Sequence, residues 1–172
     1  MPAMVFDGLL CANDDERFML EALREAEIAV LEGEVPVGAV VVRDGEIIAR
    51  AHNRVETDRN SSAHAEMLAL GNAERYLGAK WLTGCTVYVT LEPCSMCAGA
   101  MVLARVSRLV IGTMDPKAGA CGSVRNIAAD DRLNHRIEIT EGVLEEVCSS
   151  QLRDFFREKR RQKRVERPDE NQ

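Results

Sequence analysis

The sequence has no long apolar run and no excess of basic residues. Its longest apolar runs, residues 35–42 and 96–104, are far shorter than the 18 or more residues that a membrane span needs. Residues 1–7 carry no basic stretch ahead of an apolar one, so we expect no signal peptide and no membrane partner. The net charge of −6 argues against a protein that coats nucleic acid, and we expect no DNA partner.

The charges are unevenly distributed along the chain. Residues 1–150 hold 14 basic and 23 acidic side chains, a net of −9, whereas residues 151–172 hold 8 basic and 5 acidic ones, a net of +3. The basic excess lies in residues 157–164. This basic run has two interpretations: the solvated end of a C-terminal helix, where cations interact favourably with the helix dipole, or a surface that contacts phosphates. Charge alone favours the first.

The six cysteines do not indicate a disulfide framework, although their number is even. Such frameworks belong to short secreted chains, whereas 46% hydrophobic and 29% charged residues are the composition of an ordinary globular domain. We therefore expect reduced thiols in a cytoplasmic protein. In that setting the spacing Cys94-x-x-Cys97 indicates a metal or redox site.

Helical and strand patterns alternate along the chain and predict an α/β domain with helices packed on a sheet. The first two strands form an antiparallel hairpin, and the later strands pair in parallel through helical crossovers. We divide the chain into a flexible segment (1–13), a domain (14–165) and a flexible tail (166–172). The predicted helices are residues 14–32, 64–77, 95–104 and 143–164, and the predicted strands are residues 35–42, 46–51, 85–91, 108–112 and 136–140.

Capping residues mark the ends of two predicted helices. Asn13 or Asp14 can begin the first helix, and Gly33 can end it. Ser61 or Ser62 lies where the N-cap of the second helix is expected.

A possible metal site combines His64, at the start of one predicted helix, with Cys94 and Cys97, at the start of another. Each alone has a simpler explanation, because a histidine can sit in a core and buried cysteines can act as small apolar residues. Together they are the nitrogen and sulfur ligands that zinc prefers, and three ligands leave the fourth position open, as in catalytic sites. A structural site needs a fourth ligand. The candidates Cys85, Cys121, His52 and His135 lack ligand spacing to the three.

Glu66 follows His64 by two residues. In the first helical turn its long side chain can reach a water on the metal and act as a general acid and base. The alternative is a carboxylate that only stabilises the helix N-terminus. The whole constellation favours the catalytic interpretation.

The pattern His64-Ala65-Glu66 with Pro93-Cys94-x-x-Cys97 resembles the H-x-E…P-C-x-x-C signature of zinc nucleobase deaminases. A wider similarity, over about residues 14–165, identifies the chain as a member of the bacterial tRNA adenosine deaminases. Ser61-Ser62, in place of a common Pro-Thr pair, and Cys121 depart from the family pattern without touching the signature. The similar segments are residues 34–40, 64–70, 89–100, 115–120, 134–136 and 155–156.

The resemblance implies a three-layer α/β/α fold with a mixed five-stranded sheet and helices on both faces. It implies hydrolytic deamination of adenosine to inosine at the wobble position of a tRNA anticodon, with arginine tRNA as the expected substrate. One zinc ion per subunit, held by His64, Cys94 and Cys97, would activate water, and Glu66 would carry protons to the base. A cytoplasmic homodimer is implied as well, for which only the apolar stretch 96–104 gives a hint here.

The resemblance also implies substrate contacts. Asn53 would hydrogen-bond the flipped-out base, and Val37 would form an apolar wall of its pocket; ignoring the family, they are a loop residue and a strand core residue. Asp115 and Lys117 would meet the anticodon loop, or else form an exposed turn. Phe156, beside Phe155 and the basic run, would contact RNA, because single-stranded RNA is bound by aromatic surfaces and cations.

Three other functions remain open. A deaminase of free guanine, cytosine or a nucleotide shares the three ligands but needs no basic C-terminal helix. A non-catalytic RNA-binding subunit with structural zinc leaves Glu66 without a role. A thiol oxidoreductase using Cys94 and Cys97 leaves the His64-Ala65-Glu66 motif unexplained.

Overall fold

The computed structural model describes residues 11–166 and confirms the predicted order of helices and strands. Residues 1–10 and 167–172, in the two terminal segments of our division, lie outside this description. No helix in the described part of the chain has the length and apolarity to cross a membrane. The elements are α1 (Asp14–Leu31), β1 (Gly38–Arg43), β2 (Glu46–His52), α2 (Ala65–Leu77), β3 (Cys85–Leu91), α3 (Ser95–Leu103), β4 (Arg108–Thr113), β5 (Glu138–Thr140) and α4 (Glu145–Glu166).

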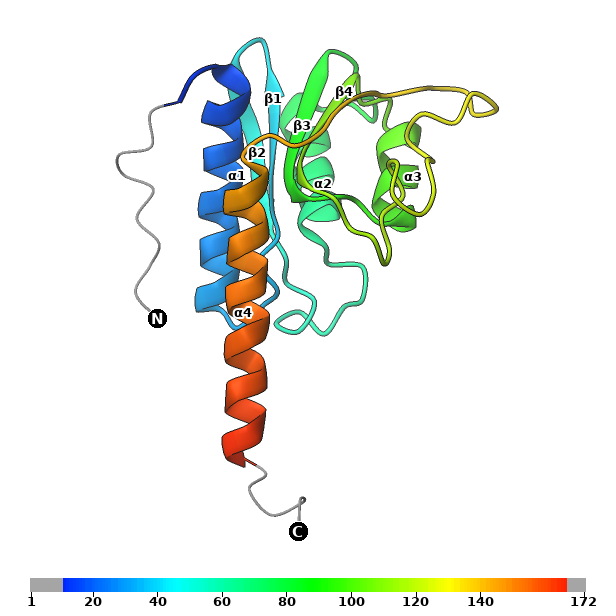
Figure 1. Ribbon diagram of the computed structural model, residues 1–172. Helices are drawn as coiled ribbons and strands as arrows, with labels where there is room; N and C mark the ends of the chain where they lie inside the picture. Colours follow the sequence, from blue (N-terminus) through cyan, green and yellow to red (C-terminus); the bar gives the residue numbers. More distant parts are fainter. Residues whose placement is uncertain (1–10, 167–172) are drawn as a thin grey trace.

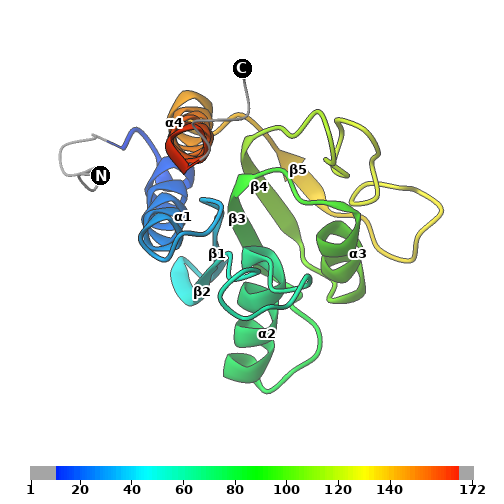
Figure 2. The ribbon, with the colours of Figure 1, turned by 90° about the horizontal axis from the view of Figure 1, so that it is seen from below.

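The five strands form one mixed sheet in the order β2-β1-β3-β4-β5 (Figure 2). β1 is antiparallel to both β2 and β3, whereas β3, β4 and β5 are mutually parallel neighbours. The predicted hairpin and parallel strands are therefore confirmed. The prediction of helical crossovers is wrong for β4 and β5, because residues 114–137 join them without an α-helix.

Helices cover both faces of the sheet, as the three-layer prediction requires. Successive residues of β1 point to opposite faces: Val40 packs in the apolar layer that includes Phe18 of α1 and Cys148 of α4, and Val41 packs in the layer that includes Ala69 of α2 and Met101 of α3. Figure 1 shows α1 and α4 together on one side of the sheet, with α4 continuing beyond the body of the domain. A sheet buried on both faces explains the nearly continuous apolar sequence of β1.

β1 begins at Gly38, three residues later than predicted. Pro36 has no backbone N–H for a strand ladder, and the ladder starts only after it. Gly38 also lets the strand approach α1 closely, since a Cβ there would lie 1.9 Å from the carbonyl oxygen of Ala22. The amide of Gly38 donates to Oγ1 of Thr90 at 3.1 Å, which ties the start of β1 to β3.

Local capping fixes α1 as predicted. The side chain of Asn13 accepts a hydrogen bond from the amide of Glu16 at 3.0 Å, and Gly33 follows the helix with a φ of 81°. Ser61 and Ser62 lie near the N-cap of α2, as predicted, but neither residue is the N-cap itself. His64 occupies the N-cap position, and its side chain makes no capping hydrogen bond because it is turned toward the two cysteines described next.

Candidate active site

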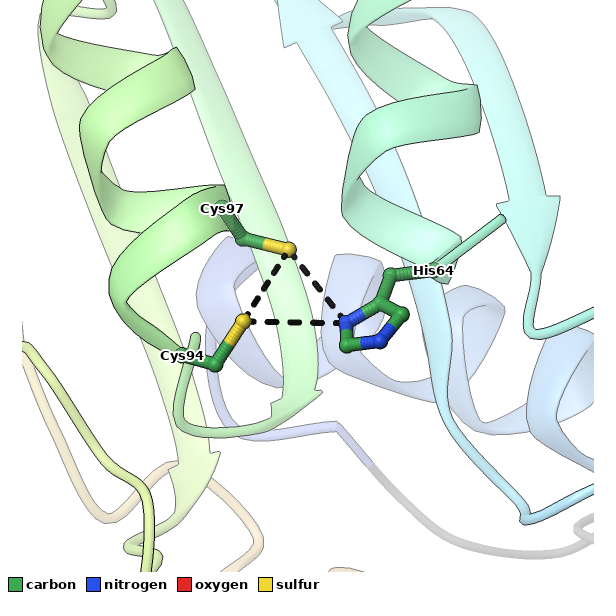
Figure 3. A group of neighbouring side chains, drawn as sticks. All are labelled: His64, Cys94 and Cys97. Atoms are coloured by element: carbon green, nitrogen blue, oxygen red, sulfur yellow. Dashed lines mark hydrogen bonds between the residues drawn. The ribbon is translucent and has the colours of Figure 1, made fainter. Parts of the chain in front are cut away.

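The N-termini of α2 and α3 meet at three metal-ligating side chains (Figure 3). His64 is the N-cap residue of α2, Cys94 is the N-cap residue of α3, and Cys97 lies in the first turn of α3. Neither N-cap side chain makes a capping hydrogen bond to its own helix, and the two face one another instead. The positive ends of two helix dipoles favour thiolate at this place.

The geometry of the three side chains fits a zinc ion. Nδ1 of His64 lies 3.7 Å from Sγ of Cys94 and 3.5 Å from Sγ of Cys97, and the two sulfurs are 3.7 Å apart. Tetrahedral bonds of about 2.3 Å to sulfur and about 2.0–2.1 Å to nitrogen would place two sulfurs about 3.8 Å apart and sulfur and nitrogen about 3.6 Å apart. Within residues 11–166, this is the one group of three such ligands. An open fourth position is the arrangement of catalytic zinc.

Glu66 lies next to this group, in the first turn of α2, and its side chain is buried. Burial raises the pKa of its carboxyl above the ordinary value, and the carboxyl group contacts the Cys97 thiol. Burial likewise raises the pKa of the Cys97 thiol. A cation bound beside the thiol would lower this pKa again. A raised pKa makes a carboxyl group a better proton acceptor, which favours a role in proton transfer.

Asn53 and Val37 are held together beside the segment that leads to His64. The amide of Arg54 donates to the carbonyl oxygen of Ala63 at 3.0 Å, so the loop after β2 runs next to the start of α2. The amide of Asn53 donates to the carbonyl oxygen of Val37, also at 3.0 Å. Both side chains are buried, Asn53 at 8% exposure and Val37 at 9%.

A cavity of about 770 Å³ lies between α4 and the loop after β4, and its lining includes Asp115, Lys117 and Phe156. Three arginines of α4, Arg153, Arg157 and Arg160, also line it, and none of the three metal-ligating side chains does. Asp115 turns its side chain back into the loop, where Oδ1 accepts from the amide of Lys117 at 2.9 Å. The predicted site residues therefore form two neighbouring groups, one near His64, Cys94 and Cys97 and one around this cavity.

The neighbouring Phe155 and Phe156 have different environments. Phe155 is 8% exposed and belongs to the core, whereas Phe156 is 44% exposed and lines the cavity. Their rings lie edge to face with centroids 5.5 Å apart. The aromatic surface beside the basic run is therefore that of Phe156.

Glu92 joins the loop after β4, which lines the cavity, to the start of α3. Its buried carboxylate accepts hydrogen bonds from the amides of Asp115 at 2.8 Å, Cys121 at 2.9 Å and Ser123 at 3.0 Å. Beyond Glu92, the amide of Ala120 donates to the carbonyl oxygen of Pro93 at 2.9 Å. The two groups are thus connected through the residues that precede Cys94.

Comparison with known proteins assigns the family. A family model for MafB19-like deaminases matches residues 13–160. The tRNA-specific adenosine deaminase of Bacillus subtilis is 54% identical over 155 residues, which cover 90% of this chain and 96% of that protein. The tRNA-specific adenosine deaminase of Aquifex aeolicus is 49% identical and covers 84% of this chain and 95% of its own. The chain belongs to the tRNA-specific adenosine deaminase family.

Solved structures agree with this assignment. A structure from work on A-to-I editing by tRNA:A34 deaminases superposes on the deaminase with a TM-score of 0.76 and 41% identity, covering 79% of this chain and 99% of that one. A guanine deaminase from Nitrosomonas europaea superposes with a TM-score of 0.72, but at 28% identity, covering 85% of each chain. The fold and the family resemblance inferred from the sequence are confirmed.

Two carboxylates of the deaminase site had no role assigned from the sequence. Glu34 binds the side chain of Asn53, and Glu92 binds the cavity loop. A signal for both existed, since each acidic residue directly adjoins a buried apolar segment, where a charge is costly unless it is hydrogen-bonded. Their partners lie 19 to 31 residues away, so no local pattern could name them.

Proposed function

We propose that this deaminase converts adenosine to inosine at the wobble position of a tRNA anticodon, with arginine tRNA as the substrate. The observation that carries the proposal is the three-ligand group of His64, Cys94 and Cys97 with the buried carboxyl of Glu66 beside it. The tRNA assignment draws support from relatives with this named activity that cover nearly the whole domain.

His64, Cys94 and Cys97 would hold one zinc ion per subunit. When bound, zinc makes water a nucleophile near neutral pH by Lewis-acid polarisation. Glu66 would accept one proton from that water and deliver it to N1 of adenine. It would then take the second proton of the same water from the new hydroxyl group on C6 and pass it to the amino group, which leaves as ammonia. Its burial suits these steps, because burial raises the pKa of the carboxyl group and makes it a better proton acceptor.

Asn53 would hydrogen-bond the flipped-out base, and Val37 would pack against it. Asp115, Lys117 and Phe156 would receive the rest of the anticodon loop in the neighbouring cavity. Four cationic side chains line this cavity beside the half-exposed ring of Phe156, a combination suited to phosphates and unstacked bases: Lys117, Arg153, Arg157 and Arg160.

Deamination of a free base is the second candidate, supported by the fold shared with a guanine deaminase. The cationic cavity disfavours it, since a free base has no phosphates to bind. A non-catalytic zinc protein is disfavoured by the buried Glu66, and a thiol oxidoreductase by His64, whose Nδ1 lies within 3.7 Å of both sulfurs.

We further propose a cytoplasmic homodimer. The outer face of α3 exposes an apolar stripe at helical spacing, with Met96 at 37% and Leu103 at 81% exposure and the small residues Gly99 and Ala100 between them. A second copy that packs on α3 would bury this stripe. Sedimentation velocity tests this proposal, and Leu103→Asp is expected to give monomers.

The activity is tested with an arginine tRNA anticodon stem-loop that carries adenosine at the wobble position. We expect inosine in the purified product, read by sequencing, and no turnover of guanine, cytosine or free adenosine in parallel reactions. Turnover of a free base with an unchanged stem-loop would contradict the proposal and favour the second candidate.

A further inference from the structure

We infer that Glu34 is a positioning residue that fixes the amide orientation of Asn53 and thereby decides which polar atoms Asn53 offers to the base. The inference rests on the proposed function, in which Asn53 contacts the substrate. Glu34 itself is fully buried, at 0% exposure, and would act on the substrate only through Asn53.

The carboxylate of Glu34 lies between two neutral donors. Its Oε2 accepts from Nδ2 of Asn53 at 3.1 Å, and its Oε1 accepts from the amide of Thr57 at 2.6 Å. In the described part of the chain no Lys, Arg or His forms an ion pair with Glu34. A carboxylate buried without a cation is costly, so its presence beside Asn53 indicates a role other than stability.

A carboxylate can only accept hydrogen bonds, which makes the orientation of Asn53 unique. If the Asn53 amide were rotated by half a turn, Oδ1 would face Oε2 of Glu34, and two acceptors would oppose one another. The observed orientation leaves Oδ1 and the second Nδ2 hydrogen available for a bound base. The backbone N–H of Asn53 also donates to the carbonyl oxygen of Val37. Both the backbone and the side chain of Asn53 are therefore fixed before substrate arrives.

The variant Glu34→Gln tests this arrangement with almost no change in shape. Its amide oxygen can still accept from the Thr57 amide, which leaves its NH₂ group facing Asn53. Asn53 would then turn its Oδ1 toward residue 34 and offer NH₂ where Oδ1 was. The double variant Glu34→Gln/Asn53→Asp restores an oxygen to that place, because one carboxylate oxygen of residue 53 accepts from the new NH₂ group and the other faces the base.

We expect Glu34→Gln to raise KM for the anticodon stem-loop about tenfold, the scale of one misdirected hydrogen bond, with kcat less affected and the zinc content unchanged. The double variant should recover part of this loss, whereas Asn53→Asp alone, with two carboxylates facing each other, should be the weakest. Glu56→Gln, an exposed residue of the same loop, is the matched control and should keep the KM of the parent. A parent-like KM in Glu34→Gln, or a double variant no better than Glu34→Gln alone, would overturn the inference.

A second measurement separates this inference from the proposed function. The side-chain NH₂ signals of Asn53 in ¹⁵N NMR spectra should be protected from exchange in the substrate-free parent and should shift in Glu34→Gln. Absence of stem-loop turnover by the parent would refute the proposed function alone. Unchanged Asn53 signals in Glu34→Gln would refute the role of Glu34, whatever the substrate.

Discussion

The carboxylate of Glu92 accepts a hydrogen bond from the amide of Cys121 at 2.9 Å, across 29 residues of sequence. The same side chain accepts from the amides of Asp115 and Ser123 and from the Ser123 hydroxyl. Glu92 directly precedes Pro93 and Cys94, so one buried carboxylate joins the loop that lines the cavity to the start of the metal-ligating helix. The closeness of this packing shows at Gly119, where a Cβ would lie 2.0 Å from Oε2 of Glu92.

Replacing Glu92 should loosen this loop. In Glu92→Gln one acceptor oxygen becomes an NH₂ group that opposes N–H donors, and we expect the free energy of unfolding to fall by about 1–3 kcal/mol. Urea unfolding measures the loss, and limited proteolysis should cut within residues 113–126 faster than in the parent. Glu46→Gln, at an exposed strand end, is the control. Equal stability and equal cleavage in both variants would show that the loop is held by other contacts.

Replacing Glu66 should separate catalysis from metal binding. We expect Glu66→Gln to keep its zinc and its fold and to lose at least about 10²-fold in turnover, because the amide cannot shuttle protons. Zinc content by elemental analysis and inosine formation on the stem-loop are measured on the same preparation. Loss of zinc together with activity would instead show that Glu66 is needed for zinc binding.

Removing the metal should destabilise the contact between α2 and α3. The three ligand atoms come from the N-termini of these two helices, so an ion bound in the folded state alone stabilises their junction. We expect about one zinc per chain in the parent, less in Cys97→Ser, and a lower Tm after treatment with a chelator. Cys11→Ser, at an exposed thiol, should keep both zinc and Tm; a chelator that leaves the parent's Tm unchanged would contradict the prediction.

The basic end of α4 should contribute to RNA binding through phosphates. Arg160, Lys163 and Arg164 are exposed, and in the described part of the chain they form no ion pairs, unlike Arg157 and Arg161. Changing these three to Gln should reduce the slope of log affinity against log salt concentration by about 0.7 for each phosphate that is no longer neutralised. Substitution is preferable to truncation after residue 153, which would remove the core residue Phe155.

The control for this experiment is Lys80→Gln. Lys80 lies beyond the C-terminal end of α2, whereas His64 lies at the opposite, N-terminal end of that helix. Its salt slope should equal that of the parent. An unchanged slope in the triple variant would return the basic run to the role of a solvated helix end.

Stability at acidic pH should depend on the ion pair between Asp15 and Arg108. The two side chains form paired hydrogen bonds of 2.8 Å, and Arg108 holds the pKa of Asp15 below its usual value. A carboxyl group with a lowered pKa in the folded state stabilises the protein above its unfolded pKa of about 3.9, and this contribution is lost as pH falls through the folded pKa.

We therefore expect Asp15→Asn to be less stable than the parent near pH 6, with the difference shrinking below about pH 4. Urea unfolding across this range measures it. Asp14→Asn is the matched control, because Asp14 occupies the same helical turn but pairs with Arg17 at an exposed site, where ion pairs contribute little. A difference between Asp15→Asn and the parent that is constant down to about pH 2 would contradict the assignment.

Most of the fold followed from local physics. The caps Asn13 and Gly33 fixed α1, and the β-branched runs located the strands to within a few residues. The start of β1 was missed because Pro36 suits either an early strand residue or the segment before a strand. The expectation of helical crossovers failed between β4 and β5, although no helix was predicted between residues 112 and 136, because a Gly-rich loop of long-range contacts has no helical or strand period.

The sequence by itself predicted that His64, Cys94 and Cys97 come together with Glu66 beside them, since these four residues lie in short motifs at helix starts where spacing fixes geometry. Only the tertiary structure decided how the residues predicted to contact substrate are held. The bonds of Glu34 to Asn53 and of Glu92 to the cavity loop, and the placement of Phe156 and Lys117 around one cavity, join residues far apart in the chain. Such pairs depend on how strands and helices pack in space, which no local periodicity encodes.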